Sequence, residues 1–364
     1  MESMVDKGFW KGKKVFITGH TGFKGSWLCL WLHSLEADIT GYSLPPPTDP
    51  CLYSLCRIDE LLPSFTEDIR DGGKLKQALV SAQPEIVFHL AAQPIVRESY
   101  KNPAETYGIN IMGTVNLLEA VRACPAVRAA VNVTSDKCYE NRECFTGYSE
   151  NDSLSGYDPY SGSKACSEIV TSSYRNSFFN IKNYDVHRVG LATARAGNVI
   201  GGGDWSCDRL IPDCIRALMA NHEILLRNPD AVRPWQHVLE PLGGYMLLAQ
   251  RLYENGRMYS QAWNFGPDGN EPRTVEWIVK KLCGKWGGPS TYRVVEEKHL
   301  HETSYLKLDC VKAKKALGWY PRWDEERALD KTIEWYKAYR EAGDLRSACY
   351  GQIEEYSGEA VLPG

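Results

Sequence analysis

The sequence predicts an α/β fold in which a doubly wound parallel sheet is accompanied by a smaller mixed α/β lobe. Two observations support this prediction. Over the first 190 residues, short and wholly apolar segments alternate with longer segments of helical apolar spacing. Such alternation is typical of parallel strands that helices bury on both faces. In addition, the first apolar segment leads directly into a glycine-rich turn, Gly19-His20-Thr21-Gly22-Phe23-Lys24-Gly25, and then into a helical pattern.

The expected elements follow one another in a regular order. Residues 14–18 are the first strand, residues 26–35 the first helix and residues 39–42 the second strand. Four prolines between residues 44 and 50 make that segment a loop. Further strands are expected at residues 63–69, 85–90, 129–133 and 185–189, and further helices at residues 73–82, 106–124 and 163–179. Beyond residue 191 the chain mixes glycine turns, short strands and helices.

Composition excludes several classes of function. The chain of 364 residues has a formal net charge of −4, so there is no electrostatic reason to expect nucleic acid or an anionic membrane as a partner. The longest apolar runs, such as residues 244–249, are too short to cross a bilayer. Residues 1–14 carry scattered charges and no apolar signal segment, so we expect a cytoplasmic protein.

Cysteine and histidine usage gives no indication of a metal site. The twelve cysteines are scattered without a Cys-x-x-Cys motif, and the eight histidines show no ligand spacing. Small buried cysteines in a reducing compartment explain this pattern better than disulfides or bound metal. We therefore expect no metal.

The glycine turn predicts a dinucleotide site. Gly19, Gly22 and Gly25 lie between a strand and a helix, where glycine lets the backbone turn tightly and approach a pyrophosphate at the helix N-terminus. The second strand ends at Tyr42 and Ser43, without the acidic residue that often binds the ribose. No arginine there favours a 2′-phosphate, so NAD is expected rather than NADP.

A tyrosine and a lysine four residues apart, Tyr160 and Lys164, predict redox chemistry. This spacing places two side chains on one helix face. A neighbouring ammonium group stabilises a phenolate, so we expect it to lower the tyrosine pKa from its usual value of about 10. A solvated helix face is the alternative explanation of a lone Tyr-x-x-x-Lys pattern. Ser135 and the glycine turn, upstream in this order, favour the chemical explanation.

Together these motifs resemble the extended short-chain dehydrogenase/reductase superfamily. The shared stretches are the glycine turn, Asp68-Ile69, His89-Leu90-Ala91-Ala92-Gln93, Asn110, Ser135 and Tyr160-x-x-x-Lys164. Within the superfamily, residues 195–205, 233–241 and 308–310 and the proline-rich loop resemble the CDP-D-glucose 4,6-dehydratases. The resemblance implies a Rossmann domain that binds NAD over residues 1–190, completed by part of 235–265. Residues 191–234 and 266–364 would form a nucleotide-sugar-binding lobe.

The resemblance also implies a reaction without net redox change. NAD+ would oxidise CDP-D-glucose at C4, water would leave across C5 and C6, and the hydride would return to C6. By position, Tyr160 would take the C4 hydroxyl proton, and Ser135 would hydrogen-bond the C4 oxygen. Lys164 would hold the phenolate and bind the nicotinamide ribose, and Asp136 would protonate the departing C6 hydroxyl.

Further residues are assigned to ligand binding by the same resemblance. The cofactor contacts would be Gly19, Thr21, Gly22, Phe23, Lys24, Gly25, Asp68, Ile69, Leu90, Ala91, Ala92, Asn110, Tyr160 and Lys164. The substrate contacts would be Gln93, Asn198, Arg209, Arg233 and His237. Alternatives remain for several: Asp68 and Ile69 suit a loop acid and a core aliphatic, Asn198 suits a turn, and Arg233 can pair with Asp230. His237, beside Trp235, suits a structural role equally well.

Lys137 departs from the pattern of the related dTDP-glucose dehydratases, which have a glutamate there as the presumed base at C5. A lysine acts as a base only where desolvation or nearby positive charge lowers its pKa. Lys137 is therefore either that base or a cation that stabilises the enolate, and a lysine that faces solvent is the third explanation. The sequence does not decide among them.

Two alternative functions were weighed against the dehydratase. A nucleotide-sugar 4-epimerase needs only oxidation and re-reduction at C4, so it has no use for a charged pair after Ser135. A non-catalytic NAD-binding protein needs no basic phenolate. Asp136 and Lys137 therefore favour elimination. The superfamily also implies a homodimer or homotetramer through the helices expected at residues 106–124 and 163–179.

Overall fold

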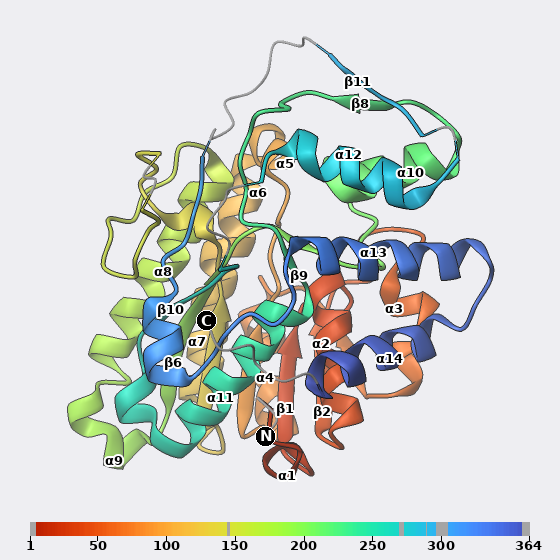
Figure 1. Ribbon diagram of the computed structural model, residues 1–364. Coiled ribbons are helices and arrows are strands. Elements are labelled where there is room, and N and C mark those ends of the chain that lie inside the picture. The colour runs from red at the N-terminus through yellow and green to blue at the C-terminus, as the bar shows by residue number, and fades with distance from the viewer. Residues whose placement is uncertain (1–4, 144–145, 269–272, 289, 296–304, 359–364) are drawn as a thin grey trace.

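A computed structural model describes residues 5–143, 146–268, 273–288, 290–295 and 305–358 (Figure 1). Its centre is a seven-stranded sheet of order β3-β2-β1-β4-β5-β6-β10, in which all neighbouring strands are parallel. The strands are β1 (Lys14–Thr18), β2 (Asp38–Ser43), β3 (Ser64–Thr66), β4 (Ile86–His89), β5 (Ala129–Val133), β6 (Gly190–Ala196) and β10 (Ala262–Phe265). The doubly wound parallel sheet that the sequence predicts is thus confirmed.

Both faces of the sheet are covered, and successive residues of β1 show it. Val15 and Ile17 belong to one hydrophobic core together with α2 (Phe23–Ser34) and α11 (Leu239–Tyr259). Phe16, which points the opposite way, belongs to a second core with α4 (Gly72–Ala82) and α7 (Gly113–Arg122). Because neither face meets water, the polar groups of the sheet gather at the strand ends.

The helix that carries the tyrosine–lysine pair begins earlier than the apolar pattern indicates. α8 runs from Pro159 to Ser177, whereas the sequence predicts a start at residue 163. Asp158 caps it, because its carboxylate accepts from Ser161 N at 2.9 Å, and Pro159 occupies the first helical position. Tyr160 and Lys164 therefore lie one turn apart in the same helix.

The strand expected at residues 185–189 is wrong. Residues 184–187 form a short helix, α9 (Tyr184–His187), which ends where Arg188 takes a left-handed conformation. Val186 is 87% exposed, and the neighbouring charged side chains have no place in a doubly covered strand. The strand is instead β6, whose seven residues are all buried. The sheet therefore includes residues 191–196, which the sequence assigns to the smaller lobe. The division into two lobes stays a prediction.

The remaining elements surround this sheet (Figure 1). Long helices are α10 (Leu210–Met219), α12 (Val275–Trp286), α13 (Glu325–Arg340) and α14 (Leu345–Gly358). Short helices are α1 (Lys7–Trp10), α3 (Leu52–Leu55), α5 (Val96–Lys101), α6 (Pro103–Tyr107), η1 (Ile58–Glu60), η2 (Gly108–Met112), η3 (Asp136–Cys138), η4 (Ile181–Asn183) and η5 (Ala313–Leu317). Two small parallel sheets pair β7 (Val199–Ile200) with β9 (Gln236–His237), and β8 (Ile224–Leu226) with β11 (Tyr292–Val294).

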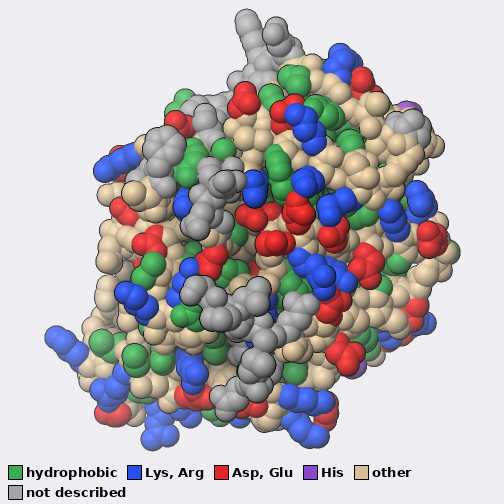
Figure 2. All heavy atoms as spheres, viewed as in Figure 1, with side chains coloured by type: hydrophobic (Ala, Val, Ile, Leu, Met, Phe, Trp, Pro, Cys, Tyr) green, Lys and Arg blue, Asp and Glu red, His purple; other side chains and the backbone are tan. Residues whose placement is uncertain are grey.

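Surface and helix properties agree with the composition. Acidic and basic side chains are interspersed over the face that Figure 2 shows, without a large field of one sign. Within the described ranges, every helix is too short or too polar to serve as a membrane span.

A buried carboxylate joins the C-terminal helices to the main core. Glu240, in the first turn of α11, is fully buried. Its oxygens accept from Arg322 N, Trp323 N and Tyr356 Oη at 2.7–3.1 Å. Burial raises the pKa of Glu240 to about 7, although these hydrogen bonds oppose the change. One side chain thus anchors α14 and the segment before α13.

Replacing Glu240 with alanine should destabilise the protein strongly, because buried donors of three residues lose their acceptor. Each such loss costs about 1–3 kcal/mol, so the free energy of unfolding should fall by roughly 3 kcal/mol or more. Urea denaturation measures this change. The control is Glu254→Ala on the exposed face of the same helix, which should cost less than about 0.5 kcal/mol. Equal effects of the two substitutions would contradict the anchoring role.

Candidate active site

The glycine turn packs closely against both the loop after β4 and the first turn of α2. Gly19 has a φ of +75°, and a Cβ there would lie 2.6 Å from Ala91 N. A Cβ on Gly25 would lie 2.2 Å from Gly19 O, so both positions exclude a side chain. Gly22 precedes the first turn of α2 and provides no side-chain cap for it. The first N–H groups of α2 are therefore left for an anionic ligand such as a pyrophosphate.

Other residues expected to bind the cofactor surround this turn. Thr21 Oγ1 donates to Leu44 O at 2.9 Å and so fastens the turn to the segment after β2. The Asp68 carboxylate accepts from Arg70 Nη2 at 2.6 Å, and the Arg70 guanidinium holds the pKa of that carboxyl below its usual value. Ile69 is buried in the second core. Phe23 and Lys24 begin α2, and Leu90, Ala91 and Ala92 follow β4.

Asn110 and Gln93 are engaged with the protein itself. Asn110 Nδ2 donates to Ser163 Oγ at 2.8 Å and to Gln93 O at 3.0 Å, while Asn110 Oδ1 accepts from Gln93 N at 2.9 Å. The Gln93 side chain donates to Thr106 Oγ1 and accepts from Ile95 N. The Asn110 amide thus links the loop after β4 to α8, and the Gln93 amide links the same loop to α6. Direct ligand contacts of the two residues stay predictions.

The turn after β5 gathers the serine, the aspartate and the lysine. Ser135 Oγ donates to Asp136 Oδ1 at 3.0 Å, and Lys137 Nζ lies 3.5 Å from the same oxygen. Asp136 is fully buried, and its Oδ2 has no hydrogen-bond partner among the described residues. Lys137 Nζ also donates to Asn198 Oδ1 at 3.5 Å. Its ammonium group thus points toward the aspartate rather than into open solvent.

Tyr160 lies against this turn. Its phenol lies close enough to Ser135 for the serine hydroxyl to favour the phenolate, and the side chain is 8% exposed. Lys164 Nζ, one turn further along α8, donates to Val133 O at 3.2 Å. The structure therefore brings together all five residues to which the sequence assigns catalytic roles.

The expected lowering of the Tyr160 pKa is wrong for the ligand-free protein. Burial raises the pKa of Tyr160 to about 12, and the nearby Asp136 acts in the same direction. Ser135 and Arg209 oppose this effect. Burial also lowers the pKa of Lys164 to about 8. The sequence reveals the spacing of the pair but not its burial, and burial dominates both groups.

Cations from several elements surround these groups. Arg209, at the start of α10, donates to Asp204 Oδ2 at 2.9 Å and acts electrostatically on Tyr160. Burial, with the nearby positive charges of Arg209, Lys164 and Lys137, lowers the pKa of Lys24 to about 7. The centre is therefore rich in positive charge, as binding of an anionic ligand requires.

Two of the expected substrate residues, Asn198 and Arg233, belong to segments near the reaction centre. A Cβ on Gly197 would meet Pro234 Cγ at 2.3 Å and Asp136 Oδ2 at 3.0 Å, so the segment that contains Arg233 adjoins the reaction centre. Arg233 lines a small cavity of about 30 Å³ with Arg273 and Tyr305. Asn198 faces Lys137 as described above.

His237 is buried in the protein, in contrast to the expected substrate contact. Its side chain is fully buried between the rings of Trp27 and Trp323, with centroids at 6.0 and 4.9 Å. Burial lowers the pKa of His237 to about 3. A neutral histidine enclosed by aromatic rings has a structural role, which the sequence offers as the alternative.

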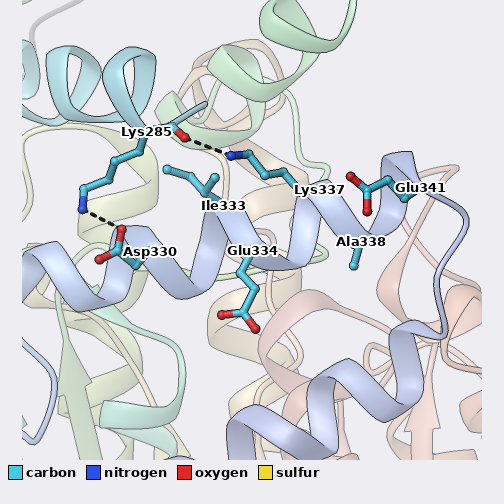
Figure 3. Close-up of a pocket in the computed structure, with 7 residues that line it drawn as sticks. All are labelled: Lys285, Asp330, Ile333, Glu334, Lys337, Ala338 and Glu341. Carbon is cyan, nitrogen blue, oxygen red and sulfur yellow. Dashed lines mark hydrogen bonds and ion pairs between the residues drawn. The ribbon is translucent and has the colours of Figure 1, made fainter. Parts of the chain in front are cut away.

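An open groove of about 550 Å³ lies elsewhere, between α12 and α13 (Figure 3). It is lined by Lys285, Asp330, Ile333, Glu334, Lys337, Ala338 and Glu341. Lys285 Nζ pairs with Asp330 Oδ1 at 2.6 Å, and Lys337 Nζ donates to Lys285 O at 3.0 Å. None of the expected site residues lines this groove, so the chemistry is assigned to the strand ends.

Comparison with known proteins agrees with this geometry. A model of the GDP-mannose 4,6 dehydratase family matches residues 16–332. The chain belongs to this family. It is 53% identical over 353 residues to the CDP-glucose 4,6-dehydratase of Salmonella typhimurium strain LT2, covering 97% of this chain and 98% of the relative. The dTDP-glucose 4,6-dehydratase of Streptomyces antibioticus is 27% identical over 90% of this chain and 93% of its own length.

Solved structures of other enzymes share the fold. A UDP-glucose-4-epimerase from Stenotrophomonas maltophila with bound NAD superposes with a TM-score of 0.78 at 22% identity, covering 91% of this chain and all of the other. The dTDP-glucose 4,6-dehydratase DesIV from Streptomyces venezuelae gives 0.77 at 23% identity, covering 91% and 99%. The family match over residues 16–332 and the relative of 53% identity confirm the expected superfamily.

In this member of the GDP-mannose 4,6 dehydratase family, the sequence motifs do not include one buried ion pair near the site. Glu168 lies one turn beyond Lys164, and its carboxylate meets Arg195 Nη2 at 2.8 Å. The Lys-x-x-x-Glu spacing on a helix is the local signal for the first partner. No local signal identifies the second, because Arg195 lies on β6.

Proposed function

We propose that the protein is an NAD-dependent lyase that converts CDP-D-glucose to CDP-4-keto-6-deoxy-D-glucose. The observation that carries this proposal is the turn after β5, where Asp136 and Lys137 adjoin Ser135 and Tyr160. A charged pair at this point serves elimination of water, which an epimerase does not perform. The identity of 53% with a CDP-glucose 4,6-dehydratase supports the choice of cytidine and glucose.

The residues at the strand ends fit the cofactor. Gly19 and Gly25 permit the close backbone approach that a pyrophosphate needs, and the first N–H groups of α2 point at it. Lys164 would hold the nicotinamide ribose through its ammonium group. NAD+ supplies the acceptor that takes a hydride from the sugar and later returns it.

The residues of the chain control the protons of the first step. Tyr160 accepts the C4 hydroxyl proton, and Ser135, which lies beside the phenol, orients the C4 oxygen. The pKa of Tyr160 is about 12, so a nearby positive charge must lower it before the phenol can act as a base near neutral pH. Arg209 already opposes the effect of burial, and a positive charge near the phenol has the same direction.

Asp136 and Lys137 serve the elimination step. The C4 ketone makes the C5 hydrogen acidic, and a base must then remove it while an acid protonates the C6 hydroxyl. Asp136 Oδ2 is buried and without a partner among the described residues, so it is the oxygen that faces the leaving hydroxyl. Lys137 is the base at C5, or it stabilises the enolate while another group takes the proton.

Purified protein with NAD+ should convert CDP-D-glucose to a 4-keto-6-deoxysugar, detected by its absorbance in alkali. Other NDP-glucoses should react more slowly. Tyr160→Phe should reduce turnover by about 10²-fold or more while CDP-glucose binding, measured by calorimetry, persists. No keto product from CDP-glucose with the unaltered protein would overturn the proposed function.

Lys137→Met should distinguish the two roles of the lysine. With CDP-glucose in D₂O, the base role predicts that transfer of solvent deuterium to C5 falls by about 10²-fold or more. NADH should still accumulate, because C4 oxidation does not need this amine. Mass spectrometry of the product and absorbance of NADH measure the two steps. Unchanged deuterium incorporation would exclude the base role.

We also propose that the protein forms a homodimer through α7 and α8 with the neighbouring η2. Met112 and Ile169 are 52% and 55% exposed, although both belong to helices that pack on the sheet. Exposed apolar side chains on adjoining helices are typical of a symmetric interface. A tetramer through a further face is compatible with the same contact.

Ile169→Asp should therefore convert the dimer to a monomer, because two carboxylates would be buried at a two-fold contact. Light scattering after gel filtration measures the mass. Val186→Asp is the matched control, since Val186 is 87% exposed on α9, outside the proposed interface. An Ile169→Asp protein with unchanged mass would contradict this interface.

A further inference from the structure

A buried ion pair joins the catalytic helix to the sheet. Glu168 on α8 and Arg195 on β6 are 2% and 3% exposed. Arg195 Nε donates to Glu168 Oε1 at 2.9 Å, and Arg195 Nη2 donates to Glu168 Oε2 at 2.8 Å. Two planar groups thus meet through two parallel hydrogen bonds, which fixes both distance and orientation.

The carboxylate of the pair also holds the segment in front of the catalytic turn. Thr134 Oγ1 donates to Glu168 Oε1 at 2.5 Å, and Thr193 Oγ1 donates to Glu168 Oε2 at 2.7 Å. Lys164, one turn earlier, donates to Val133 O. α8 therefore grips two consecutive residues at the end of β5, and the residue that follows them is Ser135.

The guanidinium of the pair holds the other end of the same turn. Arg195 Nη1 donates to Tyr139 Oη at 2.7 Å, and its Cζ lies 4.9 Å from the centre of the Tyr139 ring. Tyr139 Oη in turn donates to Asn264 Oδ1 at 2.7 Å. Tyr139 directly follows η3, which contains Asp136 and Lys137.

We propose that Glu168 and Arg195 are positioning residues that hold the turn from Thr134 to Tyr139 in register with Tyr160 and Lys164. This inference rests on the proposed function, since the turn carries the residues assigned to elimination. The carboxylate fixes the entry to the turn, and the guanidinium fixes its exit. A displacement of about 1 Å at such residues costs about 10²-fold in rate.

The pair also acts electrostatically on the lysine. Burial lowers the pKa of Lys164 to about 8, and the negative charge of Glu168 opposes that change. Cys138 on η3 also raises the pKa of Lys164. The charge of Lys164 in turn lowers the pKa values of Lys24 on α2 and of His89 on β4. Neutralising residue 168 should therefore lower the pKa of Lys164 further, and the ammonium form should be lost at lower pH.

The test uses the double variant Glu168→Gln/Arg195→Met. A single substitution leaves a buried charge without its partner, whereas the double variant removes both charges, keeps an acceptor for one threonine and offers the hydroxyl of the other a donor. We expect kcat to fall at least tenfold and KM to change less than threefold. In the plot of kcat against pH, the alkaline limb should move to lower pH. Glu240→Gln, a buried carboxylate far from the turn in sequence and on another helix, should leave that limb in place.

Two outcomes are distinguishable. The double variant could differ from the wild-type protein only in stability, with the same kcat and the same alkaline limb. That result would overturn the positioning role. An inactive unaltered protein would instead count against the proposed function. In that case, competitive labelling of Lys164 with acetic anhydride over a pH series still compares its pKa in the two proteins. An unchanged pKa would then overturn the inference.

Discussion

The hydrogen bonds that hold the end of β5 against α8 are the interaction on which the site depends. The sheet is buried on both faces, so its polar chemistry can lie only where strands end, and β5 ends in the middle of the sheet. Lys164 and Glu168 hold Val133 and Thr134 there, and the next residue, Ser135, meets Tyr160. The buried residues of α8 are mostly polar, and they place a phenol and an ammonium group one turn apart beside the serine that follows β5.

This arrangement concentrates charge among side chains of which several are buried. Burial alone would make the ammonium groups lose their protons, and it does lower the pKa of Lys164 and of Lys24, to about 8 and about 7. Glu168 limits the effect at Lys164, while Arg209 and the other cations increase it at Lys24. The two lysines thus differ because one has a buried anion behind it and the other faces mainly positive charge.

The parts that the sequence predicted well are those encoded in short segments. The glycine turn, the strands at residues 14–18 and 129–133 and the group of Ser135, Tyr160 and Lys164 depend on neighbours in the chain, and the structure has them as expected. The failures depend on distant contacts. The strand predicted at residues 185–189 is a helix instead, because only packing decides that Val186 faces solvent. Likewise, burial of His237 and partnership of Glu168 with Arg195 involve residues far apart in the chain.

The pKa of Lys24 has a consequence for ligand binding. Near pH 7 this amine is only partly protonated, because its neighbours are cations and it is desolvated. A ligand that carries a diphosphate would place negative charge in the same centre, and an opposite charge favours the ammonium form. Binding would then draw a proton onto Lys24, and by linkage affinity would increase as pH falls toward 7. The cations of this centre repel one another, and an anionic ligand would offset this repulsion.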